Sequence, residues 1–254
     1  PGTPSSLHTL IFRFHMPLFF FLSGFLLSPR KLEMKPGNYL SALARSLGRP
    51  YVVFFLMSFA YWLLTRNLGP RAEKFVDVTW YAPLKGFATG LGADLFVNPA
   101  LWFFCSLLTT GLLYHLLRRY CSSPIATVLC TVAGVVNASL AHRFSVRLPW
   151  SLDIIGATLA FYAIGQWLRG VPTIWPTAVS RTTRGLVVIL AATIWIALAR
   201  ACGNVDLNQA QFGNREWLFL PAALSGITTV LLIGSLLPPL AISEWLSRYT
   251  LIIF

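Results

Sequence analysis

Long apolar runs separated by short polar connections dominate the chain. Seven runs approach the ~20 residues that an α-helix needs to cross a hydrocarbon core of about 30 Å, and an eighth begins at Tyr249. None shows the polar/apolar alternation of a membrane strand. The pattern predicts an all-α, polytopic transmembrane helical bundle of seven helices plus the start of an eighth. The seven runs lie near residues 9–27, 50–65, 101–118, 124–141, 150–168, 185–202 and 217–237.

The composition indicates that most of the exterior faces lipid. Apolar residues make up 56% of the chain and charged residues only 11%, whereas soluble domains carry about 25% charged residues. Soluble enzymes, disordered regulators and disulfide scaffolds are therefore excluded. The cysteines show no CxxC spacing, so we expect small packing residues and no metal site. They are Cys105, Cys121, Cys130 and Cys202.

The charge balance is strongly basic, with 20 Lys+Arg against 8 Asp+Glu and a formal net charge of +12. The basic residues stand singly or in short groups between apolar runs, which favours membrane topology and contact with anionic lipid over nucleic-acid binding. The connection over residues 28–49 is the most basic, with Arg30, Lys31, Lys35, Arg45 and Arg49. By the positive-inside rule we place it in the cytoplasm. The longest connection spans residues 66–100, and we expect the part around 80–96 to be re-entrant or interfacial.

Ionisable side chains inside the first run require an explanation. Arg13 and His15 lie well within the apolar stretch TLIFRFHMPLFFFLSGFLL. An Arg at the bilayer centre costs at least roughly 2.5 kcal/mol, so such a group normally faces a protein interior or a cavity. Pro17 cannot donate to the Arg13 carbonyl, which predicts a kink. The alternative is that Arg13 reaches the interface and His15 makes a hydrogen bond between helices.

Two further patterns are candidates for binding sites. Ser23 and Gly24 form a small pair that lets another backbone approach, and a cavity lined by His15 could extend to the Ser23 hydroxyl. Arg45 and Arg49 are four residues apart on one helical face, which suits the phosphate oxygens of a cofactor. Anionic lipid headgroups are the alternative ligand.

Polar residues near the later runs allow more than one interpretation. Asp153 falls in the first turn of a helix that begins after Pro149, where a carboxylate complements the helix N-terminus or binds a ligand. Asp206, Asn208 and Asn214 form a polar loop at a helix mouth. The sequence contains no Gly-rich phosphate loop, zinc spacing or nucleophile elbow.

Together these segments resemble a known family. The relevant stretches are FHMPLFFFLSGFLL, ARSLGRPYVVFF, ALWFFCSLL, LPWSLDIIGATLAFYAIGQWLR, VDLNQAQFGN, AALSGITTVLL and SRYTLIIF. In this order they resemble the acyltransferase-3 family of integral membrane O-acyltransferases, particularly its fucose O-acetylase-like branch. The resemblance covers nearly the whole chain, as a single domain over residues 1–254.

The resemblance implies transfer of an acetyl or similar acyl group from a CoA thioester, typically acetyl-CoA, to a sugar hydroxyl. It matches His15 to the His of the FHMPLFFF motif, Arg45 and Arg49 to a basic pair that helps hold the donor, and Asp153 to the acid of LPWSLD. The family also carries a preceding helix with an Arg and a His, and a further His after TLII. The chain is therefore expected to be a fragment, truncated at both ends.

We accordingly expect a multi-pass acyltransferase of the cell membrane, in a bacterial plasma or inner membrane. His15 would act as base or orient the acceptor, Arg13 would stabilise negative charge, and Ser23 and Asp153 would bind substrate. The expected partners are a CoA thioester, a carbohydrate acceptor and membrane lipid, with no nucleic acid and no metal. The alternatives are a non-enzymatic carrier or flippase for glycan intermediates and a structural membrane subunit.

Overall fold

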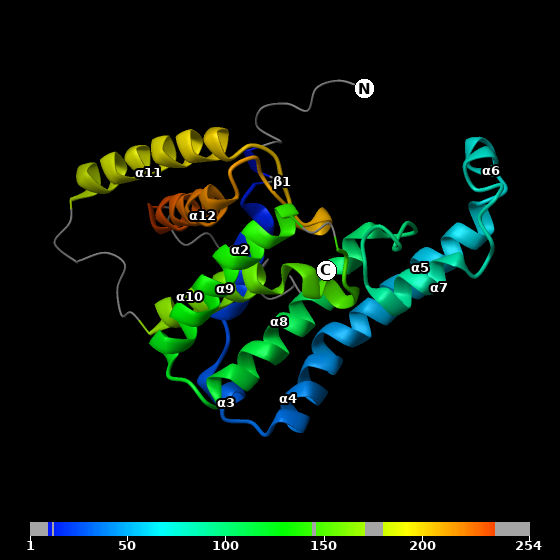
Figure 1. The fold of residues 1–254 in the computed structure, drawn as a ribbon, viewed down its shortest axis with the longest axis horizontal. Coiled ribbons are helices and arrows are strands. Elements are labelled where there is room, and N and C mark those ends of the chain that lie inside the picture. Colours follow the sequence, from blue (N-terminus) through cyan, green and yellow to red (C-terminus); the bar gives the residue numbers. More distant parts are fainter. Residues whose placement is uncertain (1–9, 12, 144–145, 171–179, 237–254) are drawn as a thin grey trace.

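The structure, a computed structural model, describes residues 10–11, 13–143, 146–170 and 180–236 (Figure 1). Within these ranges six helical segments are long and apolar enough to cross a membrane. They are Pro36–Thr65, Pro99–Arg118, Ser123–Ala141, Pro149–Arg169, Thr182–Cys202 and Glu216–Leu236. These segments confirm the predicted all-α membrane bundle. The eighth run, from Tyr249, lies outside the described residues.

The elements follow one another with short connections. The α-helices are α2 (His15–Phe25), α3 (Pro29–Leu32), α4 (Pro36–Leu43), α5 (Arg49–Thr65), α6 (Pro70–Lys74), α7 (Ala82–Thr89), α8 (Trp102–Arg118), α9 (Ser123–Arg143), α10 (Ile155–Arg169), α11 (Arg181–Cys202) and α12 (Phe219–Leu236). The π-helical segment is η1 (Ala44–Gly48), and the 3₁₀-helical segments are η2 (Pro99–Leu101), η3 (Pro149–Ile154), η4 (Leu207–Gln209) and η5 (Glu216–Leu218). Strands β1 (Val205–Asp206) and β2 (Gln211–Phe212) pair antiparallel.

Helix α10 is the centre of the bundle, because it packs against α9, α2 and α8. Helices α11 and α12 form a second pair, and α12 also contacts α2 and α9. Figure 1 shows this pair on one side of α10 and the long α4–α5 helix on the other, with α5 reaching away from the rest. Most of the buried core therefore lies around α10, whereas α5 and α11 expose apolar side chains as expected for helices facing lipid.

The first predicted run, over residues 9–27, contains the short helix α2, and part of the run lies outside the described residues. Helix α2 begins only at His15 and has 11 residues, or roughly 16 Å, which is less than a hydrocarbon core. Arg13 and Phe14 form a turn before it. Pro17 has no N–H for the Arg13 carbonyl, so the regular helix is interrupted where the proline predicts it. Within the described residues the predicted bundle thus consists of six spans and one shorter apolar helix, which agrees broadly with the predicted number of helices.

The basic connection predicted over residues 28–49 is largely helical, in line with the expectation that Arg45 and Arg49 lie on a helix. Helices α4 and α5 join through η1, a π-helical segment over Ala44–Gly48, into a continuous helix from Pro36 to Thr65. The Arg49 N–H bonds to the Ala44 carbonyl, five residues earlier. Pro50 explains the wide turn, because it lacks an N–H and its ring crowds the carbonyl of Ser46.

Two glycines let α2 and α10 approach at backbone distance. A Cβ on Gly24 would lie 1.9 Å from the Tyr162 carbonyl oxygen, and one on Gly165 would lie 2.0 Å from the Phe21 carbonyl oxygen. Small residues have this role at membrane helix interfaces, where close packing replaces the hydrophobic effect as the source of attraction. The predicted role of Gly24 as a site of backbone approach is confirmed. The Arg169 guanidinium adds a hydrogen bond from Nη1 to the Leu27 carbonyl, at 2.7 Å.

Gly24→Ala should separate α2 from α10, because the new methyl group meets a backbone atom that cannot rotate away. We expect a loss of about 1–3 kcal/mol of stability, the usual range for overpacking, measured as thermal unfolding of the purified protein in detergent. Gly185→Ala in α11 is the matched control, since nothing lies within 4 Å of its added Cβ. Equal melting temperatures for the two variants would contradict this packing.

Candidate functional site

The turn that leads into α10 has an unusual backbone. In η3 (Pro149–Ile154) both Trp150 and Ser151 adopt left-handed conformations, with φ of 58° and 57°. This backbone conformation costs about 1–3 kcal/mol for each such residue, and it persists only where the surrounding structure holds it in place. The Trp150 Nε1–H donates to the Ala88 carbonyl at 3.1 Å, which ties the turn to the end of α7. We refer to Pro149–Ile154 as the α10 turn.

Asn137, in the middle of the apolar helix α9, supports the α10 turn from the other side. Its Nδ2 donates to the Asp153 carbonyl at 2.7 Å, and its Oδ1 accepts from the Ala157 N–H at 3.2 Å. Both partners are backbone groups at the start of α10, where the first four N–H groups of a helix have no intrahelical acceptor. A single side chain therefore caps α10 and joins it to α9. Gly156 permits the contact, since a Cβ there would lie 2.5 Å from the Ala133 carbonyl oxygen.

Asp153 forms an ion pair with Arg147, with 2.7 Å between Oδ2 and Nε. The Asp153 side chain is only 5% exposed and that of Arg147 is 31% exposed. The Arg147 Nη2 also donates to the Asn208 carbonyl at 2.7 Å. This arginine thus connects the α10 turn to the loop between α11 and α12. The carboxylate predicted to bind substrate is directed toward a cation of the protein, and its role in substrate binding stays a prediction.

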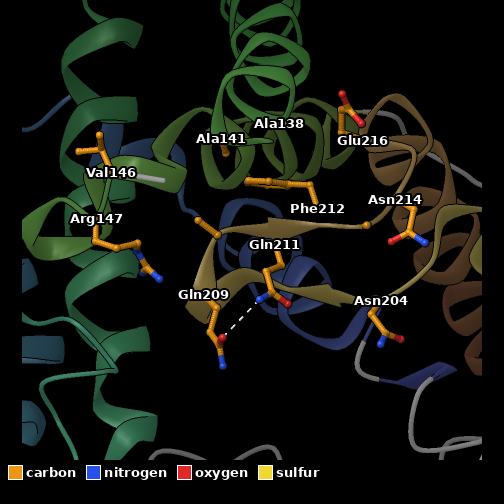
Figure 2. A pocket seen from close by; sticks show the side chains of 12 residues that line it. Ala138, Ala141, Val146, Arg147, Asn204, Gln209, Gln211, Phe212, Asn214 and Glu216 are labelled. Carbon is orange, nitrogen blue, oxygen red and sulfur yellow. Dashed lines mark hydrogen bonds between the residues drawn. The ribbon is translucent and has the colours of Figure 1, made fainter. Parts of the chain in front are cut away.

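A cavity of about 380 Å³ opens beside Arg147. Figure 2 shows Gln209 and Gln211 next to each other in its wall, joined by a 3.4 Å hydrogen bond from Nε2 of Gln211 to Oε1 of Gln209, with Arg147 to one side. Carboxamides dominate the polar part of the wall. The lining residues are Ala138, Ala141, Val146, Arg147, Asn204, Gln209, Ala210, Gln211, Phe212, Gly213, Asn214 and Glu216.

Arg13 lies near Cys202, the last residue of α11. The Cys202 Sγ in turn lies 3.5 Å from the Phe212 carbonyl oxygen. Phe212 lines the cavity. His15 follows at the start of α2, where its Nδ1 is 3.2 Å from the Ile11 carbonyl oxygen. Arg13 is thus brought near the polar end of the bundle, although neither it nor His15 belongs to the cavity lining.

The other predicted site residues lie elsewhere. Arg45 and Arg49 are exposed on the helix that packs against α8, and the Arg45 Nε donates to the Ser41 carbonyl at 3.2 Å. The Ser23 hydroxyl donates to the Phe19 carbonyl at 2.8 Å, a bond within its own helix. None of these residues lines the cavity. Their predicted roles in binding CoA and acceptor stay predictions.

Sequence reasoning identified Asp153 and the polar loop with Asp206, Asn208 and Asn214, but it overlooked Arg147 and Asn137. Asn137 offered a usable signal, because an amide in the middle of an apolar span usually bonds to another helix. Arg147 offered none, since Asn208 lies 61 residues away in the chain and only the unusual α10 turn brings Asp153 to it. Among the described residues no group of three or more His, Cys, Asp or Glu side chains could hold a metal ion.

The architecture is that of a polytopic membrane protein with a polar site at one end of an apolar helical bundle. The model of an acyltransferase domain, Acyl_transf_3, matches residues 1–254. The chain belongs to this acyltransferase family. Comparison with curated proteins and with solved structures gives no significant match.

The Arg147 and Asp153 ion pair should show strong coupling in a double-mutant cycle. Asp153→Leu alone leaves the partly buried cation unpaired, and we expect it to cost about 1.5–3 kcal/mol. Arg147→Met on the Asp153→Leu background should restore part of that loss, because neither charge then remains unpaired. Thermal unfolding of the wild type, both single variants and the double variant gives the coupling. Additive losses would mean that the two side chains stabilise the fold independently.

Proposed function

We propose that this protein is a membrane O-acyltransferase that moves an acyl group, most simply acetyl, from a CoA thioester to a hydroxyl of a sugar or glycan. The observation that carries the proposal is the polar cavity beside the Arg147 and Asp153 pair, in a membrane bundle that belongs to an acyltransferase family. A structural subunit would not need an open cavity lined by carboxamides at this point.

The reaction requires a base and a site for negative charge. The acceptor oxygen loses its proton and attacks the thioester carbonyl, a C–O bond forms, the C–S bond breaks, and the CoA thiolate takes up a proton. His15 is the proposed base or the group that orients the acceptor hydroxyl, since imidazole can hold the proton at neutral pH. Arg13, two residues earlier, is the proposed electrostatic partner of the developing oxyanion.

Arg45 and Arg49 are the proposed contacts for the phosphates of CoA. Both guanidinium groups are exposed, so neither needs to break an ion pair before it binds an anion. The π-helical segment η1 contains Arg45 and ends beside Arg49. Such segments occur frequently at functional sites, where the widened turn redirects side chains.

His15→Ala should lower acyl transfer by roughly 10²-fold or more if His15 is the base, because general base catalysis contributes about that factor. The measurement is the transfer of label from radiolabelled acetyl-CoA to a glycan acceptor in membranes. His15→Gln separates the two roles, since an amide can hold a hydroxyl but cannot take its proton. If His15→Ala and His15→Gln lose acyl transfer equally, His15 is the base. Substantial transfer activity in His15→Gln instead indicates that His15 orients the acceptor.

Leu26→Ala, at the far end of α2 on a side chain that is 71% exposed, is the matched control for insertion and folding and should keep wild-type turnover. Unchanged turnover in His15→Ala would remove this residue from the chemistry.

Arg45→Ala and Arg49→Ala should each raise the KM for acetyl-CoA by roughly 10-fold, since a lost charge-assisted hydrogen bond costs about 1.5 kcal/mol or more. The KM for the acceptor should stay unchanged, because these residues do not line the polar cavity, which is where we place the acceptor. Arg30→Ala, which also removes an exposed cation, is the control. A KM for acetyl-CoA that responds equally to all three substitutions would point to a general electrostatic effect.

A glycan carrier is the second candidate, because an open polar cavity in a membrane bundle also suits passage of a polar substrate. The label experiment separates the two functions. An acyltransferase leaves the acetyl label on the acceptor, whereas a carrier moves the glycan across the membrane without consuming acetyl-CoA.

A further inference from the structure

The loop between α11 and α12 forms most of the cavity wall and presents an unusual set of side chains. Four carboxamides, from Asn204, Gln209, Gln211 and Asn214, line the cavity, and all four residues are exposed. Each carboxamide offers two N–H donors and one carbonyl acceptor. Within the described part of the chain, the side chains of Asn204 and Asn214 make no hydrogen bond, and Gln209 and Gln211 share only one. Most of the hydrogen-bonding groups of these four side chains are therefore available to a ligand.

The formal charges of the cavity wall cancel. Arg147 is its one lining cation and Glu216 its one lining carboxylate, and Arg147 is already paired with Asp153. A site for phosphate or carboxylate would instead present an excess of cations or backbone N–H groups. The cavity therefore suits an uncharged ligand. This separates it from Arg45 and Arg49, which carry no carboxylate partner among the described residues.

The loop is held in shape before any ligand binds. The Asn208 N–H donates to the Asp206 carboxylate at 2.9 Å, and the Asn214 N–H donates to the Cys202 carbonyl at 2.7 Å. Gly213, with φ of 90°, sits so close to Cys202 that a Cβ would lie 2.4 Å from its carbonyl oxygen. Arg147 fixes the Asn208 carbonyl from the α10 side. A preformed wall lowers the entropy that a ligand must lose on binding.

One side of the cavity is apolar, as a binding site for a sugar ring requires. Ala138 and Ala141 of α9, together with Phe212, also line the cavity, and Figure 2 shows them on the side of β2 away from the Gln209 and Gln211 carboxamides. A sugar ring presents hydroxyl groups around its edge and C–H groups on its faces, so it needs this combination of amides and apolar surface. The volume of about 380 Å³ lies in the range of small-molecule sites, which begins near 300 Å³.

We propose that this cavity binds a neutral, polyhydroxylated unit, and that Gln209, Gln211, Asn204 and Asn214 determine its specificity for uncharged sugars. In the context of the proposed acyl transfer, on which this part rests, the unit is the acceptor. The acceptor then binds beside Arg147, while Arg45 and Arg49 hold the donor on another helix.

The test is the double variant Gln209→Ala and Gln211→Ala, whose side chains are exposed and bond only to each other. Two lost hydrogen bonds of about 0.5–1.5 kcal/mol each predict a roughly 10-fold weaker interaction. The probes are methyl glycosides of neutral hexoses, titrated into the purified protein without CoA, and the same glycosides serve as acceptors in the transfer assay. Asn67→Ala, an exposed amide outside the cavity, is the matched control.

The inference expects weaker glycoside binding and a higher acceptor KM in the double variant, with an unchanged KM for acetyl-CoA and no change in Asn67→Ala. Transfer with an unaltered acceptor KM and unaltered binding would overturn the inference but leave the acyltransferase function intact. Glycoside binding that depends on the two glutamines, in a protein that never consumes acetyl-CoA, would support the cavity assignment and refute the acyltransferase function. Preferential binding of uronic acid glycosides or of anionic lipid headgroups would also overturn the inference that the cavity is specific for uncharged sugars.

Discussion

The α10 turn is the constraint on which the polar end of the molecule depends. Trp150 and Ser151 lie in a left-handed conformation that ordinary residues avoid, and the turn persists because separate parts of the chain hold it. Asn137 bonds to its carbonyl group at Asp153, Trp150 bonds to α7, and Arg147 pairs with the Asp153 carboxylate. The turn thereby fixes the start of α10 relative to α9 and, through Arg147, relative to the loop after α11.

Apolar length was sufficient to predict most of the fold. Only helices satisfy their backbone groups in lipid without neighbours, so each run of about 20 apolar residues had one plausible structure. The local details depend on proline. Pro17 interrupts the regular helix before α2, and Pro50, interpreted from the sequence as the start of a span, instead lies inside a continuous helix that widens into η1.

The site was harder to predict than the fold, because its pairs join distant residues. Arg147 bonds to Asn208, and Asn137 bonds to the start of α10, but nothing in the local sequence of either residue specifies its partner. Polarity indicated that Asp153 and the loop around Asn208 mattered. It could not indicate that Asp153 forms an ion pair with an arginine of its own protein, or that the glutamines near Asn208 line a cavity.

The regular helical backbone is interrupted or widened beside three of the charged residues that the sequence singles out. Arg13 lies in the turn before α2, Arg45 lies in η1, and Asp153 lies in the α10 turn. Unsatisfied backbone groups are costly in hydrocarbon, so irregular backbone within a membrane is tolerated where protein or a polar cavity surrounds it. A residue that only reaches toward a lipid headgroup needs no such irregularity, because a regular helix can carry it. A nearby proline accounts for the irregular backbone in each case, namely Pro17, Pro50 and Pro149, so the functional roles of these charged residues stay proposals.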